Sequence, residues 1–266
     1  MNKRGDIWMK ALAENGQVAT GFSPSVQVVD DQFNGLAVRY INVTQDLNNA
    51  FPRARNGEVG LLEGWNVAKA VRQVVERDQD RHSKSVIVAI IDVPSQAYGR
   101  REEAYGIHLS LAAAANAYAQ ARKAGHPVLG LIVGKAMSGG FLAHGYQASR
   151  LIALDDDQCS VHAMGKASAA KVTLRTVDQL ESLAAEHPPM AYDINHYHTL
   201  GLLWKLVSVE NAQQPSSQDI DHIRSVFSAA LEDIKVNGND WSHRLEGENR
   251  QATRHIREQM QQAWVY

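Results

Sequence analysis

Short apolar runs alternate with amphipathic segments along the chain, and this alternation predicts strands and helices in turn. The runs at 85–93 and 128–133 are continuous and apolar, which is typical of strands buried on both faces of a sheet. Residues 150–154 form a third such run. At 61–75 and 102–124, apolar residues recur at steps of three and four, the spacing of one helical face. The order of these segments predicts right-handed βαβ units in an α/β fold.

Turn and capping signals mark the two ends of this α/β region. Residues 25–44 contain two extended runs joined by Asn34 and Gly35, a pair typical of tight hairpins. Ser216 and Asp219 form a capping box before an apolar stripe that predicts a long helix. Because no repeat or linker interrupts the chain, we expect a single domain. Its predicted limits are 1–266, with a core at about 25–210 and a helical C-terminal extension at about 215–266.

Composition and charge narrow the functional classes. The chain has 27 basic and 29 acidic side chains, a formal charge of −2, and 44% hydrophobic residues. Nucleic-acid binding normally requires a basic surface, so we expect no nucleic-acid partner. No apolar run reaches the length of a membrane span, so we expect no membrane association. The single cysteine, Cys159, and the absence of a secretion signal favour a cytoplasmic protein.

Familiar cofactor and metal motifs do not fit the chain. The segment from Gly130 to Ala136 resembles a phosphate-binding P-loop, but it is one residue too short and lacks the Ser or Thr that binds magnesium. No G-x-G-x-x-G follows a strand, which argues against a nicotinamide dehydrogenase. Histidine and aspartate residues lack zinc or calcium spacing, so we expect no metal site.

Two turns at strand ends carry the remaining candidate chemistry. Residues 94–96 follow the first buried strand, and the glycine-rich residues 134–140 follow the second, before a short helix expected at 141–148. Ligands gather at the carboxyl ends of strands in α/β sheets. Backbone N–H groups of such turns can stabilise an oxyanion, and one donor is worth roughly 3–4 kcal/mol. The alternative is that Gly139 and Gly140 only permit close helix–strand packing.

The sequence around these turns resembles the carboxyltransferase branch of the crotonase superfamily. Acyl-CoA carboxylases of that branch carry a D-T-P-G turn, an acidic helix, and then G-x-x-x-S-G-G-A before a strand. The matching positions here are Asp92, Pro94, Glu102, Glu103, Gly134, Ser138, Gly139 and Gly140. Within the branch, the stretches DVPSQAYGRREE and GKAMSGGFLAHGYQASRLIAL resemble the gamma subunits of biotin-independent malonate decarboxylases. This resemblance covers essentially the whole chain.

The resemblance implies a crotonase-like ββα superhelix followed by helices. It also implies decarboxylation of a malonyl thioester to the acetyl thioester, with the substrate carried on the prosthetic-group thiol of an acyl-carrier protein and without biotin. The active site of such an enzyme lies between gamma and beta subunits. The implied partners are therefore a beta subunit, in a heterodimer or heterotetramer, and an acyl-carrier protein subunit.

The resemblance also assigns roles to residues of the two turns. The Gly139 amide, with Gly140 beside it, is one implied oxyanion donor. The amide of Ser95 or Gln96 is the other. We expect the substrate surface to include Pro94, Gly134, Ser138 and His162. Ser95 replaces the glycine of the carboxylases, and we expect its side chain to narrow the space for a biotin ring. Two groups of the substrate could accept the hydrogen bonds of these amides, the thioester carbonyl and the departing carboxylate, and the sequence does not decide between them.

Two other functions stay open at this point. Clp-type serine peptidases place their nucleophile in a comparable turn, with a histidine roughly two dozen residues later, and His162 follows Ser138 at that interval. Glycine follows Ser138 where the protease has methionine, and no third catalytic residue is evident. The other alternative is a non-catalytic scaffold that docks the beta subunit and the carrier protein.

Overall fold

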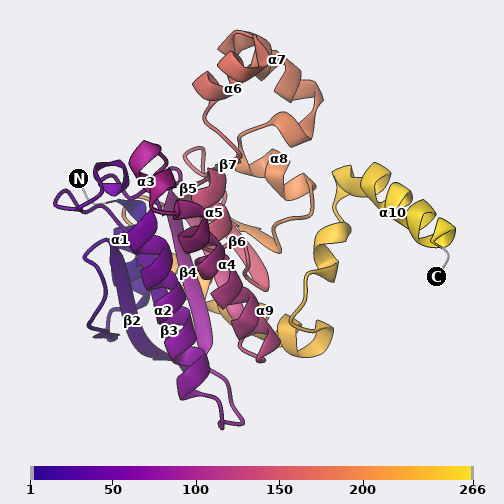
Figure 1. Cartoon of the computed structure of the whole chain (residues 1–266). Coiled ribbons are helices and arrows are strands. Elements are labelled where there is room, and N and C mark those ends of the chain that lie inside the picture. Colours follow the sequence, from indigo (N-terminus) through magenta and orange to yellow (C-terminus); the bar gives the residue numbers. More distant parts are fainter. Residues whose placement is uncertain (1–2, 265–266) are drawn as a thin grey trace.

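The chain folds as a mixed sheet with helices on both faces (Figure 1), and the computed structural model describes residues 3–264. The outermost four residues of the predicted domain, 1–2 and 265–266, lie outside the described residues. The strands are β1 (Gln17–Val18), β2 (Val26–Phe33), β3 (Leu36–Val43), β4 (Val86–Val93), β5 (Val128–Met137), β6 (Arg150–Leu154), β7 (Ser160–His162) and β8 (Lys205–Val207).

The helices fall before, between and after these strands. The α-helices are α1 (Arg4–Leu12), α2 (Leu61–Arg77), α3 (Arg100–Ala104), α4 (Ile107–Lys123), α5 (Ser138–Ala143), α6 (Lys166–Thr173), α7 (Val177–Glu186), α8 (Ile194–Thr199), α9 (Ser217–Asn237) and α10 (Gln251–Ala263). The 3₁₀ turns are η1 (Pro52–Ala54), η2 (Pro188–Met190), η3 (Ser242–Leu245) and η4 (Glu248–Arg250). No helix within residues 3–264 is long and apolar enough to cross a membrane.

The sheet has the strand order β1-β2-β3-β4-β5-β6-β8, and β7 pairs with the end of β5. Strands β1, β2 and β3 are antiparallel, whereas the pairs from β3 through β8 are parallel. The predicted N-terminal hairpin is confirmed. Phe33 pairs with Leu36, and Asn34 and Gly35 between them both have positive φ, as a tight type I′ turn requires.

Helices cover the sheet on both faces. In Figure 1, α2 and α4 pack against each other in front of the sheet. Helix α1 contacts β3, β4 and β5 as well as α9. Trp8 of α1 is fully buried, and its indole N–H donates to the carbonyl oxygen of Ala212 at 2.9 Å. The first helix is therefore part of the core, although the predicted core began only at about residue 25.

The predicted strands are confirmed, but two predicted helices differ from the structure. The helix predicted at 102–124 is divided into α3 and α4, because Gly106 adopts a left-handed φ of 80° between them. Gly125, two residues after the end of α4, has a φ of 88°, the left-handed conformation that commonly ends a helix. On α2, Trp65 is 49% exposed, so it lies off the buried face that the periodicity predicted.

The second difference concerns the glycine-rich turn that was expected at 134–140. Strand β5 continues through most of it to Met137, because Lys135, Ala136 and Met137 pair with β7. The following helix then begins at Ser138 and ends at Ala143, so the helix predicted at 141–148 was placed too late. The turn between strand and helix is consequently much sharper than the sequence suggested.

Helices complete the C-terminal part of the chain. The predicted capping box is confirmed at the start of α9, where the Ser216 hydroxyl accepts from the Asp219 N–H at 3.2 Å. Beyond α9, the buried Arg244 side chain donates to the carbonyl oxygens of Tyr146 at 3.1 Å and Ala148 at 2.6 Å. These bonds tie the C-terminal segment to the loop between α5 and β6.

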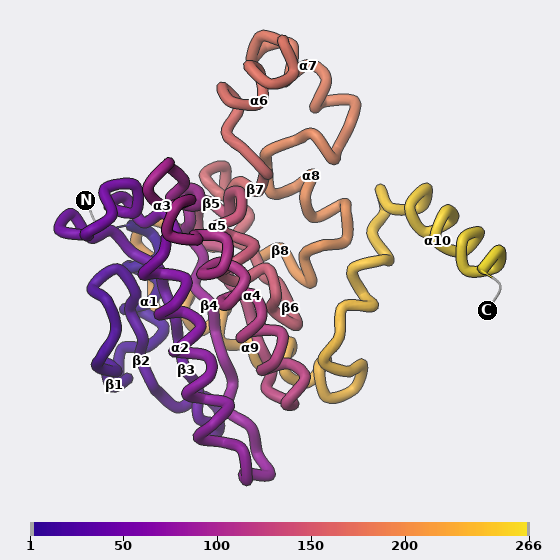
Figure 2. The backbone as a smooth tube through the Cα atoms, viewed as in Figure 1, coloured from indigo at the N-terminus to yellow at the C-terminus, as the bar shows by residue number. Residues whose placement is uncertain are grey.

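The last helix projects away from the rest of the chain, as the traces in Figures 1 and 2 show. Helix α10 has no buried residue. Arg254 and Arg257 on this helix are exposed. The hairpin of α6 and α7 also stands away from the sheet, at the top of Figure 2.

A buried carboxylate network positions the loop that leads into α2. The Glu63 side chain is fully buried and accepts hydrogen bonds from Asn49 Nδ2 at 2.7 Å and from the Gly60 N–H at 2.9 Å. A buried carboxylate is tolerated only when its oxygens are satisfied in this way. The network fixes Val59, the residue that bridges to the turn after β4.

His144 makes the stability of this core depend on pH. It is fully buried, with Nε2 2.9 Å from the Ile90 carbonyl oxygen and Nδ1 3.0 Å from the Tyr118 hydroxyl. A carbonyl oxygen only accepts, so Nε2 carries the proton and Nδ1 accepts from Tyr118. Burial lowers the pKa of His144 to about 4, and the neutral ring is the stable form in the folded protein.

We predict that His144→Gln makes the free energy of unfolding less sensitive to acid. The folded-state pKa of about 4 lies below the ordinary value of 6.5, so between these values the unfolded chain binds a proton that the folded chain does not. Stability should therefore fall as the pH drops from 6.5 towards 4. On acidification, the free energy of unfolding of the variant should fall by on the order of 3 kcal/mol less than that of the original protein. Urea unfolding of both proteins at pH 7 and pH 4.5 measures this difference. An equal fall in the original protein and in the variant would contradict the prediction.

Candidate active site

Adjacent parallel strands bring the two predicted turns together. Strands β4 and β5 pair in parallel, so their carboxyl ends lie at the same edge of the sheet. The register shifts between Ile91 and Val93, and Val93 then pairs with Ala136 near the end of β5. Pro94 has no N–H to donate and ends β4. The turn at 94–97 therefore lies directly beside the start of α5.

The backbones of the two turns approach each other closely at Gly140. A Cβ atom at this position would lie 2.4 Å from the Ser95 carbonyl oxygen and 2.7 Å from Val93 Cγ1. Gly139 is different, since a Cβ there would come no closer than 3.4 Å to another atom, Gln96 Oε1. Close packing thus accounts for the glycine at 140 and does not account for the glycine at 139.

The Gly139 amide makes a direct contact with the opposite turn. Its N–H donates to Gln96 Oε1 at 2.9 Å. Val59 holds the backbone of the 94–97 turn on the side away from Gly139. The Val59 N–H donates to the Ser95 carbonyl at 3.0 Å, and the Ala97 N–H donates to the Val59 carbonyl at 2.9 Å. This bridge leaves the N–H of Gln96 pointing away from Val59.

Ser138 occupies a strained position where β5 changes to α5. Its φ of 62° lies in the left-handed region, which costs a residue with a Cβ atom on the order of 1–3 kcal/mol. The residue is half-buried. The strain makes the strand-to-helix turn sharp, and it places the Ser138 side chain at the wall of a cavity.

This cavity has a volume of about 390 Å³ and is mostly apolar. Its lining residues are Ser138, Gly139, Phe141, Leu142, Tyr146, Val161, His162, Ala163, Pro189, Ala191, Tyr197, Leu200 and Leu202. It therefore joins the turn at the end of β5 to β7 and to the segment around α8. Of the predicted substrate-binding residues, Ser138 and His162 line it.

The other two predicted substrate-binding residues lie elsewhere, Gly134 within β5 and Pro94 directly after β4. Gly134 is buried, and a Cβ there would lie 2.4 Å from Asp92 Oδ1. The Asp92 carboxylate in turn accepts from the Lys135 N–H at 3.2 Å. Pro94 is half-buried at the end of β4. In the described part of the chain, neither Gly134 nor Pro94 lines the cavity beside Gly139.

His162 is engaged by residues other than Ser138. Its Nδ1 lies 3.0 Å from the Met164 carbonyl oxygen, and its ring stacks on Tyr192 with centroids 3.8 Å apart. Burial lowers the pKa of His162 and favours its neutral form. Both members of the Ser138–His162 pair are among the described residues, and no hydrogen bond joins them. The arrangement lacks the contact that a serine nucleophile needs with its base.

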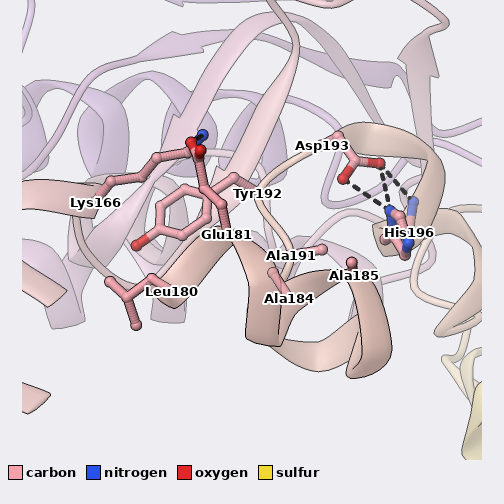
Figure 3. A pocket seen from close by; sticks show the side chains of 9 residues that line it. All are labelled: Lys166, Leu180, Glu181, Ala184, Ala185, Ala191, Tyr192, Asp193 and His196. Atoms are coloured by element: carbon pink, nitrogen blue, oxygen red, sulfur yellow. Dashed lines mark hydrogen bonds and ion pairs between the residues drawn. The ribbon is translucent and has the colours of Figure 1, made fainter. Parts of the chain in front are cut away.

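A second cavity of about 270 Å³ shares Ala191 with the first (Figure 3). Its lining carries an ion pair of Lys166 with Glu181 at 2.6 Å and a contact of His196 Nδ1 with the Asp193 carboxylate at 2.8 Å. Each of these side chains thus already has a polar partner. Among residues 3–264, no group of three or more His, Cys, Asp and Glu side chains is placed to hold a metal ion.

Sequence patterns did not reveal the side-chain contacts of this site. Gln96 was a candidate for its backbone amide, whereas its side chain makes the contact with Gly139. Tyr192, which stacks on His162, carries no motif. Helix α7, which borders the second cavity, has a signal in the sequence, because Thr176 and Gln179 form a capping box.

Comparisons with known proteins agree with the resemblance of the two turns. A sequence profile of the malonate decarboxylase gamma subunit family matches residues 54–264. A curated relative from Malonomonas rubra, malonyl-S-ACP:biotin-protein carboxyltransferase MADD, is 33% identical over 209 residues, which cover 77% of this chain and 70% of that protein.

Solved structures extend the likeness to nearly the whole chain. A chain of a Pseudomonas malonate decarboxylase hetero-tetramer in complex with coenzyme A is 52% identical, with a TM-score of 0.95 over 98% of this chain and 99% of that one. A chain of the Pseudomonas MdcD–MdcE hetero-dimer is also 52% identical, with a TM-score of 0.91 over 98% of this chain and all of that one (100%).

A more distant structure identifies the fold. Transcarboxylase 12S has a TM-score of 0.64 at 17% identity, over 86% of this chain and 40% of that one. At this identity the likeness concerns the fold alone, and it confirms the predicted crotonase-like fold of the carboxyltransferases. Because the family profile covers most of the chain and agrees with its two turns, the chain belongs to the malonate decarboxylase gamma subunit family.

Proposed function

We propose that this chain is the gamma subunit of a malonate decarboxylase. Together with a beta subunit, it converts a malonyl thioester on an acyl-carrier protein to the acetyl thioester. Family membership supports the reaction, and one observation in the site carries it. The Gly139 N–H holds a carbonyl-type oxygen, Gln96 Oε1, at 2.9 Å beside an apolar cavity.

The reaction needs stabilisation of negative charge more than it needs a nucleophile. The bond between the carboxylate carbon and the methylene carbon breaks, CO2 leaves, and the electron pair moves to the thioester oxygen as an enolate. A proton then adds to the methylene carbon and completes the acetyl group. Backbone N–H groups aimed at the enolate oxygen stabilise this charge more strongly than they stabilise the substrate.

The geometry of the two turns supports their proposed role as such donors. Oxyanion donors lie roughly 2.7–3.1 Å from the oxygen they stabilise, and the Gly139 N–H already serves an oxygen at 2.9 Å. The N–H of Gln96 is the second proposed donor, because Val59 bonds the neighbours Ser95 and Ala97 and leaves the Gln96 N–H on the opposite side. Ser95 and Gly140 act by contact, since their close approach sets the distance between the turns. Low polarity in the adjoining cavity strengthens each of these hydrogen bonds.

The proposed partners complete a site that this chain provides only in part. Two of the relatives above belong to a hetero-dimer and a hetero-tetramer, which supports a beta subunit as partner. The carrier protein presents the malonyl group on its prosthetic-group thiol. The Malonomonas relative is named for a biotin protein, whereas the more similar Pseudomonas chains belong to malonate decarboxylases. We propose that this chain works without biotin, and its higher identity to the Pseudomonas chains supports this proposal.

The two alternatives fare differently. A Clp-type peptidase is disfavoured by the missing contact between Ser138 and His162 and by the stacking of His162 on Tyr192. A non-catalytic scaffold would share every interface of the proposed subunit. It differs only in that its turns stabilise no charge, so a change at Gly139 distinguishes the two.

We predict that CO2 release from a malonyl thioester requires both subunits. The assay compares this chain alone, the beta subunit alone and the two together, each with the substrate on the carrier protein. Turnover should appear only in the mixture, because the beta subunit completes the site. Release by this chain alone would contradict the shared site, and the absence of release in every mixture would contradict the proposed function.

A second prediction concerns the Gly139 N–H itself. Gly139→Pro removes this donor, and we expect kcat of the complex to fall by roughly 100- to 1000-fold. Gly139→Ala is the matched control, because it keeps the N–H and its Cβ has ordinary contacts of 3.4 Å or more. Size-exclusion chromatography should show normal assembly for both variants. Full activity of the proline variant would instead support the scaffold.

A third prediction separates a decarboxylase from a serine hydrolase. Ser138→Gly removes the hydroxyl and suits the φ of 62°, so we expect a gain in stability of about 1 kcal/mol and a kcat within about threefold of the original. A fluorophosphonate probe should leave Ser138 of the unaltered complex unlabelled. Labelling at Ser138 together with loss of all activity in the variant would indicate a nucleophilic serine.

A further inference from the structure

We propose that the Gln96 side chain occupies the place of the substrate oxygen on the Gly139 amide and is displaced when substrate binds. This inference rests on the proposed function, because it concerns the same oxyanion donor. It adds a positioning residue that the family resemblance does not assign, since that resemblance concerns only the backbone amide of Gln96.

The contact itself shows why substrate and side chain compete. Gln96 Oε1 is a neutral carbonyl oxygen of a carboxamide, and it accepts the Gly139 hydrogen bond at 2.9 Å. A thioester carbonyl is an acceptor of the same kind. A single N–H serves one acceptor in good geometry at a time. An oxygen of the substrate therefore reaches the Gly139 amide only after Gln96 Oε1 has left it.

The surrounding structure fixes the backbone of the turn and leaves the side chain able to move. The Gln96 carbonyl accepts from the Tyr98 N–H at 3.1 Å, and Val59 bonds the residues on either side of Gln96. The Gln96 side chain is only half-buried and is held through one neutral hydrogen bond at its tip. Displacement thus breaks one bond and leaves the two turns in place.

The contact with Gln96 stabilises the protein before substrate binds. Gly139 is half-buried, and a buried N–H group without a hydrogen-bond partner lowers the stability of a protein. Gln96 satisfies this donor until the substrate arrives. The consequence is a lower affinity for substrate, because part of the binding free energy is used to displace the side chain.

The test uses Gln96→Met in the reconstituted complex, which keeps the size of the side chain and removes the acceptor. We expect KM for the malonyl thioester to fall about three- to tenfold, which corresponds to one neutral hydrogen bond, with kcat within twofold. Gln32→Met is the matched control, since Gln32 is exposed in the distant β2–β3 hairpin, and it should change neither constant. A fall in kcat at constant KM, or no change in either constant, would overturn the proposal.

An activity-independent measurement separates this proposal from the proposed function. The full chain is labelled with ¹⁵N-glycine, and the Gly139 amide signal is assigned by its loss in Gly139→Ala. We expect this amide to exchange with deuterium at least tenfold faster in Gln96→Met than in the original chain or in Gln32→Met. Faster exchange without any CO2 release by the unaltered complex would refute the proposed function alone. An unchanged exchange rate would refute the role of Gln96.

Discussion

The site depends on one steric constraint, the contact of Gly140 with the Ser95 carbonyl group. A Cβ atom at residue 140 would lie 2.4 Å from that oxygen, so only glycine lets the two turns meet. The pairing of Val93 with Ala136 brings the strand ends into register, and Val59 holds the first turn from its other side. The distance between the Gly139 amide and the opposite turn follows from these three contacts.

The Gly139 backbone N–H lies beside a mostly apolar cavity. Ser138 and His162 line the same cavity as Gly139, yet His162 is stacked on Tyr192 and bonded to Met164. In the proposed function, what the chain offers a substrate is backbone N–H donors beside an apolar cavity. Donors of this kind stabilise an enolate without forming a covalent intermediate. In the proposed function, the beta subunit completes this site.

The sequence predicted the framework well and the site only in outline. Continuous apolar runs located β4, β5 and β6, and the Asn34–Gly35 pair located the hairpin, because these signals are local. The end of β5 at Met137 was missed, since it depends on pairing with β7, a segment distant in the sequence. The Gln96 contact was missed for a related reason. Side-chain hydrogen bonds between separate turns leave no periodic pattern, whereas the glycines and proline of the turns do.

The proposed role of the Gly139 amide is tested most directly by the structure of the reconstituted complex with an unreactive malonyl-thioester analogue, in which a sulfonate replaces the carboxylate. We expect an oxygen of the analogue about 3 Å from the Gly139 nitrogen, with Gln96 Oε1 moved away from it. An analogue bound with every oxygen distant from Gly139, and with Gln96 still on the amide, would contradict the central claim that this amide stabilises the reacting group.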